Sequence, residues 1–337
     1  MTQRPSRARE LGVVPGVHRP GPHNAITDVP GVRVGQTTLH EGTRIHTGVT
    51  AIVPEQLRER TTLPAGLFVG NGYGKLVGAT QLAELGEIET PIVLTGTLSA
   101  FRAADALVTY MLGLPGNEEM RSVNPVVGET NDGYLSDIRA RPVTERHVLA
   151  ALEGARGGPV VEGCVGAGAG TSALGFKAGI GTASRDVATP AGSVTIGALV
   201  QANFGGRLTV LGVPIDRDAA LGGIDPGPEP DGNSCMIIVA TDATLDARQL
   251  TRLARRAVFG MARTGASYSH GSGDYAIAFS VGTAPALPDR ALDPLFAAVM
   301  ETVEEAILNA LFMAETTHGV EGHVRHAVPH AFVLRAL

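Results

Sequence analysis

A serine at the start of an apolar strand is the residue in this chain best suited to nucleophilic chemistry. Ser234 follows the turn-like residues Asp231, Gly232 and Asn233 and precedes the apolar run 236–240. A cut between Asn233 and Ser234 would create an N-terminus carrying a hydroxyl nucleophile and an α-amine that acts as its general base. An α-amine titrates at about 7.7–8.0, so much of it accepts a proton near neutral pH. Taken alone, the same residues are also typical of an ordinary turn.

Three further polar residues lie at the ends of expected strands. Ser272 and Asp274 are two positions apart before the strand 275–281, so an extended backbone projects a hydroxyl and a carboxylate to the same side. Asn203 ends the strand 193–201 with an amide that can donate to a developing oxyanion. Polar turns and asparagine turn formers are the alternative interpretation of both features.

Other candidate centres are weaker. Cys235 is a possible nucleophile with His270 nearby, but neighbouring side chains on a strand face opposite sides, so Ser234 and Cys235 cannot both enter one site. The histidines near the C-terminus lack metal-ligand spacing and indicate a solvated tail rather than a metal site; they are His318, His323, His326 and His330. Further glycines after the glycine-rich run 166–173 argue against the helix that a dinucleotide fingerprint needs. The loop 70–75 lacks the Walker A spacing.

Composition limits the class of protein. The 337 residues are 44% hydrophobic and carry a net charge of −6, which predicts a large core and gives no reason to expect a nucleic-acid partner. The basic residues Arg4, Arg7 and Arg9 are followed by prolines rather than an apolar segment, and no apolar run is long enough to span a bilayer. Two cysteines do not suggest a disulfide framework, so we expect a cytoplasmic protein without membrane contact.

The apolar patterns predict strands and helices without strict alternation. This order favours stacked α and β layers with a mixed or antiparallel sheet over a doubly wound parallel sheet. We expect strands at 32–39, 46–53, 67–70, 91–94, 193–201, 208–213, 236–241 and 275–281, and helices at 79–86, 99–112, 144–152, 245–261 and 293–314. The strand 208–213 is expected to form a hairpin with 193–201. Thr241 and Asp242 are the expected N-cap of the helix that follows, and residues 222–232 are the expected flexible loop.

Taken in order, these segments resemble the DmpA-type aminopeptidase family, which includes L-aminopeptidase/D-amino-acid esterases and β-peptidyl aminopeptidases. The resemblance extends from about residue 10 to residue 330, and it is the ordered combination of motifs that is specific. The residues that carry it are Ile-Thr-Asp-Val-Pro-Gly-Val-Arg-Val-Gly at 26–35, Gly-Phe-Lys-Ala-Gly-Ile-Gly-Thr-Ala-Ser-Arg at 175–185, Leu-Val-Gln-Ala-Asn-Phe-Gly at 199–205, Asn-Ser at 233–234 and His-Gly-Ser-Gly-Asp at 270–274.

The resemblance implies an αββα sandwich similar to N-terminal-nucleophile hydrolases. A single domain, residues 1–337, would be made as a precursor and cleaved into 1–233 and 234–337 at the Asn233–Ser234 bond. Site roles follow from the same resemblance: nucleophile Ser234, second serine Ser272, orienting acid Asp274, oxyanion-hole residues Asn203 and Tyr134, and Glu129 as the carboxylate that binds the substrate's amine.

The implied substrates are small peptides, amides or esters with a free amino terminus. No cofactor or metal is expected, and the implied assembly is a homo-oligomer, a tetramer. The absence of tryptophan departs from relatives that have aromatic pocket walls, so the resemblance does not give the acyl preference.

Two other functions fit parts of the pattern. Ornithine acetyltransferases resemble this family in fold and self-cleavage, but they use a threonine nucleophile where this chain has Ser234. A non-catalytic descendant that acts as a binding protein is the second alternative, although it would have no need to retain Ser234, Ser272, Asp274 and Asn203 together.

Overall fold

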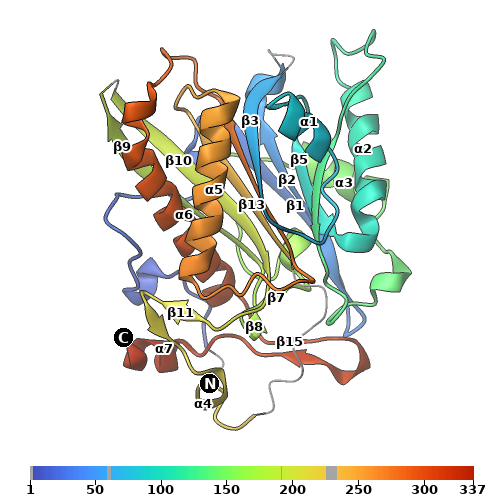
Figure 1. Ribbon diagram of the computed structural model, residues 1–337. Coiled ribbons are helices and arrows are strands. Elements are labelled where there is room, and N and C mark those ends of the chain that lie inside the picture. The colour runs from blue at the N-terminus through green and yellow to red at the C-terminus, as the bar shows by residue number, and fades with distance from the viewer. Residues whose placement is uncertain (1–2, 59–61, 191, 225–233) are drawn as a thin grey trace.

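Two β-sheets packed face to face, each covered by two helices on its outer side, form the body of the molecule in a computed structural model (Figure 1). The structure describes residues 3–58, 62–190, 192–224 and 234–337. The layer order is therefore αββα, as the resemblance implied.

The smaller sheet has four strands in the order β1-β2-β5-β6. Only its β5–β6 pair is parallel. The strands are β1 (Val32–Glu41), β2 (Ile45–Pro54), β5 (Ile92–Gly96) and β6 (Val126–Thr130).

The larger sheet has six strands in the order β4-β3-β14-β13-β10-β9, and within it only β13 and β14 are parallel. Its strands are β3 (Leu63–Gly72), β4 (Glu87–Ile88), β9 (Ile180–Thr189), β10 (Gly192–Asn203), β13 (Ser234–Thr241) and β14 (Gly273–Ser280). Both sheets are thus mixed and mostly antiparallel, which confirms the predicted fold class.

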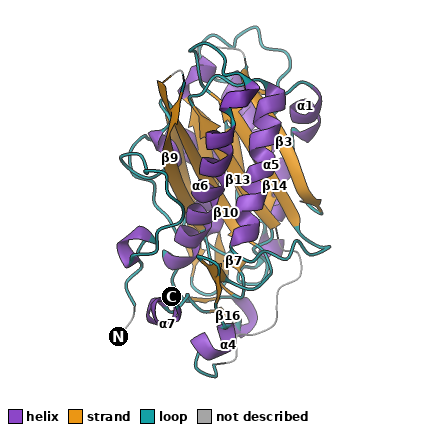
Figure 2. Cartoon of the chain, turned by 60° about the vertical axis from the view of Figure 1, so that its left-hand side comes forward, coloured by secondary structure: helices purple, strands orange, loops and turns teal. Residues whose placement is uncertain are grey.

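Four long helices cover the two sheets. Helices α2 (Ala100–Leu112) and α3 (Glu145–Glu153) pack on the four-stranded sheet, whereas α5 (Ala247–Arg263) and α6 (Asp293–Phe312) pack on the six-stranded sheet (Figure 2). Three apolar layers result, one between the sheets and one beneath each helix pair. Alternate residues of β13 explain this layering: Cys235 and Ile237 enter the helix-side layer, and Met236 and Ile238 enter the layer between the sheets.

Smaller elements lie at the ends of the sandwich. They are α1 (Ala79–Glu84), α4 (Arg217–Ala220), α7 (His330–Ala336) and the strand pairs β7 (Ser172–Ala173) with β8 (Phe176–Lys177), β11 (Thr209–Val210) with β12 (Val213–Pro214) and β15 (Thr317–His318) with β16 (Val324–Arg325). No helix in the described ranges has the length and apolar character needed to cross a bilayer.

Glycine lets two backbones touch where the large sheet meets its helices. A Cβ at Gly181 of β9 would lie 1.9 Å from the carbonyl oxygen of Ala306 on α6. A Cβ at Gly179 would lie 1.8 Å from the Gly163 carbonyl oxygen. The glycine-dense stretch 163–181 therefore serves close backbone approach rather than phosphate binding, and no α-helix follows its glycine-rich turn.

Most expected elements are confirmed, with three corrections. Strand 208–213 does not pair with β10, because β9 and β13 occupy both edges of β10; instead β11 and β12 form their own hairpin. The N-cap of α5 is Asp246, whose carboxylate accepts from the Gln249 N–H at 2.7 Å, and not Thr241 or Asp242. Strands β6 and β9 were not predicted. Of the expected flexible loop, residues 225–232 lie outside the described residues.

Candidate active site

Ser234 is the first residue of β13, and its neighbours on both sides are set by strand register. It pairs with Asn203 on β10 and with Gly273 on β14. Its hydroxyl oxygen accepts a hydrogen bond from the Gly273 N–H at 3.2 Å, and the residue is 3% exposed. The sheet therefore brings three of the predicted site segments together at one end of β13. Asn233, the other half of the expected cleavage bond, lies outside the described residues.

Ser272 and Asp274 lie beside Ser234 and contact each other. The Ser272 hydroxyl donates to Asp274 Oδ1 at 2.8 Å, as the two-residue spacing predicted. Both residues are buried, and burial raises the pKa of Asp274 to about 6 despite the opposing Ser272 hydrogen bond. Asp274 Oδ2 is buried with no hydrogen-bond partner among the described residues. This oxygen can accept one more donor at the base of the site.

Two backbone groups set the orientation of the Asn203 amide. Its Oδ1 accepts from the Ser172 N–H at 3.0 Å, and its Nδ2 donates to the Asn131 carbonyl oxygen at 3.0 Å. An amide nitrogen carries two hydrogens, so Asn203 retains a second N–H for a negatively charged oxygen. Because Asn203 pairs directly with Ser234, that donor belongs to the same end of the sheet as the serine.

Glu129 lies near the end of β6 and contacts the loop that follows β3. Its Oε1 accepts from the Lys75 N–H at 2.8 Å, and the Lys75 ammonium lies 3.6 Å from the same oxygen. The Tyr275 ring lies near both this carboxylate and Ser234. A Cβ at Gly74 would lie 3.2 Å from Glu129 Oε1 and 3.3 Å from Tyr275 Cε2. A Cβ at Gly273 would lie 3.1 Å from both Tyr275 Cε2 and Ser234 Oγ. Glu129 and Ser234 therefore both lie near the same edge of the Tyr275 ring.

Tyr134 lies in the loop after β6, three residues beyond Asn131. Its ring stacks on His323 with centroids 4.4 Å apart, and the Arg325 guanidinium carbon lies 4.2 Å from the ring centre. The described contacts thus tie Tyr134 to the β15–β16 hairpin. They do not join its phenol to Ser234.

The predicted solvated histidine tail is wrong for two of its members. His323 stacks on Tyr134, and its Nδ1 lies 2.8 Å from the Tyr134 carbonyl oxygen. His330 is buried, with Nε2 3.0 Å from the Phe312 carbonyl oxygen. The hairpin and the last helix hold these side chains through tertiary contacts that spacing along the chain cannot show.

The cysteine-nucleophile alternative is also wrong. Cys235 is fully buried in the helix-side core, and burial raises the pKa of its thiol well above the ordinary value. His270 instead lies beside the Tyr73 ring, with centroids 6.0 Å apart. Among the residues that the structure describes, no group of three or more His, Cys, Asp or Glu side chains is arranged to hold a metal ion.

Lys75 is the site residue that sequence reasoning missed. Its loop, residues 70–75, was considered only as a phosphate-binding motif and set aside. The signal that could have drawn attention to it is the dense glycine spacing Gly70, Gly72 and Gly74 directly after a strand, which indicates close approach of the backbone to other groups.

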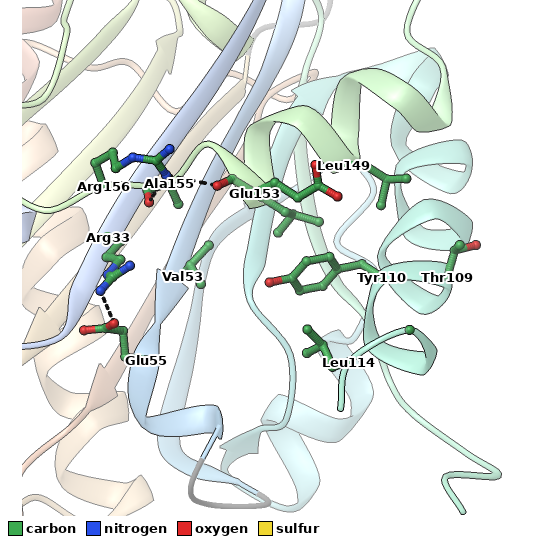
Figure 3. A pocket seen from close by; sticks show the side chains of 12 residues that line it. Arg33, Val53, Glu55, Thr109, Tyr110, Leu114, Leu149, Glu153, Ala155 and Arg156 are labelled. Carbon is green, nitrogen blue, oxygen red and sulfur yellow. Dashed lines mark hydrogen bonds and ion pairs between the residues drawn. The ribbon is translucent and has the colours of Figure 1, made fainter. Parts of the chain in front are cut away.

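A groove of about 490 Å³ lies elsewhere, on the outer face of the four-stranded sheet (Figure 3). The α2 side chains Tyr110 and Thr109 line one wall, and Arg156 and Glu153 approach from the other (Figure 3). None of the candidate catalytic residues lines it.

Comparisons with known proteins show the family of this chain. Peptidase family S58 matches residues 24–325. The "Beta-peptidyl aminopeptidase BapA" of Sphingosinicella microcystinivorans is 39% identical, over 98% of this chain and 91% of that protein.

Two solved structures share the whole fold. The PH0078 protein of Pyrococcus horikoshii OT3 has a TM-score of 0.90 and 46% identity, with 98% of each chain covered. The L-aminopeptidase D-Ala-esterase/amidase of Ochrobactrum anthropi, described as a prototype for the serine aminopeptidases and a new variant among the Ntn hydrolase fold, has a TM-score of 0.88 and 37% identity, covering 99% of this chain and 98% of that one. These similarities favour a peptidase over the acetyltransferase and binding-protein alternatives. The chain belongs to peptidase family S58 and is a serine aminopeptidase of the DmpA type.

Proposed function

We propose that this aminopeptidase is made as a precursor and cleaves its own Asn233–Ser234 bond. The Ser234 hydroxyl attacks the Asn233 carbonyl carbon, the C–N bond breaks as its nitrogen takes a proton, and an ester joins the two halves. Water then hydrolyses the ester, leaving a carboxylate on Asn233 and a free hydroxyl and α-amine on Ser234. The products are residues 1–233 and 234–337 of what remains one domain.

In the mature enzyme the same hydroxyl attacks the first carbonyl carbon of the substrate, and the Ser234 α-amine takes its proton. The observation that carries this proposal is the strand register, which sets Asn203, Ser234 and Gly273 side by side next to the 2.8 Å Ser272–Asp274 hydrogen bond. The Asp274 carboxylate supports it further, because it faces the backbone N–H of Cys235, its register partner and the residue next to Ser234, so a new α-ammonium on Ser234 forms close to an anion.

Two donors stabilise the oxyanion in this proposal, namely the second N–H of Asn203 and the Tyr134 hydroxyl. A good donor of this kind contributes about 3–4 kcal/mol of transition-state stabilisation. The acyl-enzyme ester on Ser234 is then hydrolysed, and the amino acid leaves. No cofactor or metal takes part in these steps.

Glu129 binds the substrate's protonated amine. The proximity of both Glu129 and Ser234 to one edge of the Tyr275 ring supports binding of the amine and attack on the carbonyl within one small substrate. Substrates are small peptides, amides or esters with a free amino terminus, and the similarity to β-peptidyl aminopeptidases extends the class to β-amino-acyl groups. We further propose a homotetramer located in the cytoplasm, on the family resemblance.

The test is the intact mass of the purified chain under denaturing conditions, combined with activity on amino-acyl p-nitroanilides. We expect two fragments that meet at the Asn233–Ser234 bond, and we expect Ser234→Ala to remain a single inactive chain because it lacks the attacking hydroxyl. Ser269→Ala, which removes a nearby hydroxyl outside the hydrogen-bonded pair, is the matched control and should cleave and act normally. Cleavage and activity in Ser234→Ala would overturn the proposal.

A further inference from the structure

A lysine ammonium stands beside the carboxylate that we assign to the substrate's amine. Lys75 Nζ lies 3.6 Å from Glu129 Oε1 and donates to the Thr97 hydroxyl at 2.8 Å. The two partners come from neighbouring parallel strands, because β5 leads into Thr97 and its neighbour β6 carries Glu129. The backbone N–H of Lys75 also donates to Glu129, so both the backbone and the ammonium of Lys75 contact this carboxylate.

The hydrogen-bonding capacity of both groups is only partly used. An ammonium has three donors, of which one reaches Thr97 and one faces Glu129. The Lys75 side chain is 43% exposed, so its third donor is accessible from solvent. Glu129 is 3% exposed, and its Oε2 makes no hydrogen bond with any described residue. The pair therefore offers one free donor and one free acceptor at a single place.

Two other carboxylates act on the same region. Asp132 is buried close enough to Glu129 for the two charges to interact, with the buried Lys177 partly opposing its charge, and Asp274 and Glu129 both act on Tyr275. Arg141, in the segment before α3, donates instead to the Leu98 carbonyl oxygen, next to Thr97. Without Lys75, these carboxylates would repel an anionic acyl group.

We propose that Lys75 and Glu129 form a subsite for a zwitterionic acyl group, in which Glu129 binds the ammonium and Lys75 binds a carboxylate on the same carbon. The acyl group with this arrangement is β-aspartyl, a β-amino acid whose amine-bearing carbon also carries a carboxylate. The reaction is hydrolysis of a β-aspartyl amide to aspartate and the released amine, with water as the only co-reactant. The inference rests on the proposed function of Ser234 and Glu129.

Two substrates isolate the carboxylate. The p-nitroanilides of β-aspartate and of 3-aminobutanoate, in matching configuration, share one skeleton and differ by a carboxylate in place of a methyl group. Charge-assisted hydrogen bonds are among the strong ones, so we expect kcat/KM to favour the β-aspartyl substrate by about tenfold or more. The difference should lie mainly in KM, because Lys75 contacts the acyl group rather than the reacting carbon.

Variants then assign the preference to Lys75. Lys75→Met keeps the chain length without the charge and should lower the β-aspartyl to aminobutanoyl ratio by about tenfold, through a higher KM for the β-aspartyl substrate. Lys75→Arg keeps the charge and should retain most of the preference. Arg141→Gln removes a cation that donates to Leu98, next to Thr97, and is not bonded to Lys75 or Glu129, so it should leave the ratio within about twofold. Intact mass confirms that each variant is cleaved.

The outcomes separate this inference from the proposed function. A wild-type enzyme that prefers the aminobutanoyl substrate, a ratio unchanged in Lys75→Met, or an equal loss of both activities in that variant would overturn the inference while the aminopeptidase proposal stands. Cleaved wild-type enzyme that hydrolyses neither substrate nor any other amino-acyl p-nitroanilide would overturn both.

Discussion

Asp274 is a carboxyl group whose ionisation matters to the site and whose environment resists it. Burial raises its pKa to about 6, yet only the ionised carboxylate balances a new α-ammonium on Ser234, and ionisation also strengthens the hydrogen bond from Ser272. The second proton acceptor is that α-amine, which titrates at about 7.7–8.0 in the reference state. Two protonations of different pKa therefore inactivate the enzyme as the pH falls.

The pH profile of kcat/KM should show both events. Between about pH 6 and the pKa of the α-amine, log kcat/KM should rise with a slope of one, because only the amine must lose a proton. Below about pH 6 the slope should become two, since Asp274 is then protonated as well. Asp274→Asn should be much slower and keep a slope of one throughout. A slope of one in the wild-type enzyme down to pH 5 would contradict this role for Asp274.

Among individual residues, the sequence predicted those contacts that depend on local spacing. Ser272 and Asp274 are two apart on one strand end, so their contact follows from extended backbone alone. Lys75 and Glu129 are far apart in sequence and meet only because the β3–α1 loop crosses the end of β6, a strand that was not predicted. Their pairing is a product of tertiary structure, and no local pattern encodes it.

Buried charge links several elements around α6. The guanidinium of Arg185 on β9 and the carboxylate of Glu305 on α6 are both fully buried and lie 2.6 Å apart. Arg9 of the N-terminal arm and Asn24 also contact Glu305, at 2.9 Å and 2.5 Å. The arm, the edge strand and the helix therefore share one ionic centre.

Removing the carboxylate should be costly. Glu305→Gln removes the nearer of two carboxylates beside the buried Arg185 and leaves only Glu301, 3.5 Å from its Nε, and breaking a buried pair in this way costs about 3–5 kcal/mol. Urea titration of the free energy of unfolding measures the effect. Glu119→Gln is the control, because Glu119 and Arg121 are 3.7 Å apart on the surface and should give no measurable change. Equal effects in the two variants would show that the buried centre is not important for stability.

The strand pattern predicted most elements but not their pairing. Residues 193–201 and 208–213, with Asn203, Gly205 and Gly206 between them, satisfy the local rules for a hairpin. Instead, the two edges of β10 pair with β9, which precedes it in the sequence, and with β13, which follows it. Strand β9 was missed because its start lies in the glycine-dense stretch, where glycine serves packing against α6 and weakens the strand signal.

On the scale of the whole molecule, the two expected fragments are interleaved. Strands β13 and β14 belong to 234–337 and lie in the middle of the six-stranded sheet, between β3 and β10 of the preceding fragment. Helix α6 of the later fragment covers β9 and β10 of the earlier one. Fragment 1–233 contains the whole four-stranded sheet, but neither fragment contains the complete six-stranded sheet or the complete core beneath α5 and α6, so cleavage at Ser234 should leave the native fold intact.

Unfolding of the cleaved enzyme should therefore release two chains and depend on protein concentration. Association opposes unfolding by mass action, and each tenfold increase in concentration should raise the free energy of unfolding by about 1.4 kcal/mol. The control is the Ser234→Ala variant, which stays uncleaved and unfolds to a single chain. Any concentration dependence that comes from oligomerisation is shared by both forms and cancels in the comparison. Urea titrations of the two forms at several concentrations measure the difference. Coincident concentration dependence would mean that the fragments fold independently, which is incompatible with a sheet whose two central strands come from one fragment and whose flanking strands come from the other.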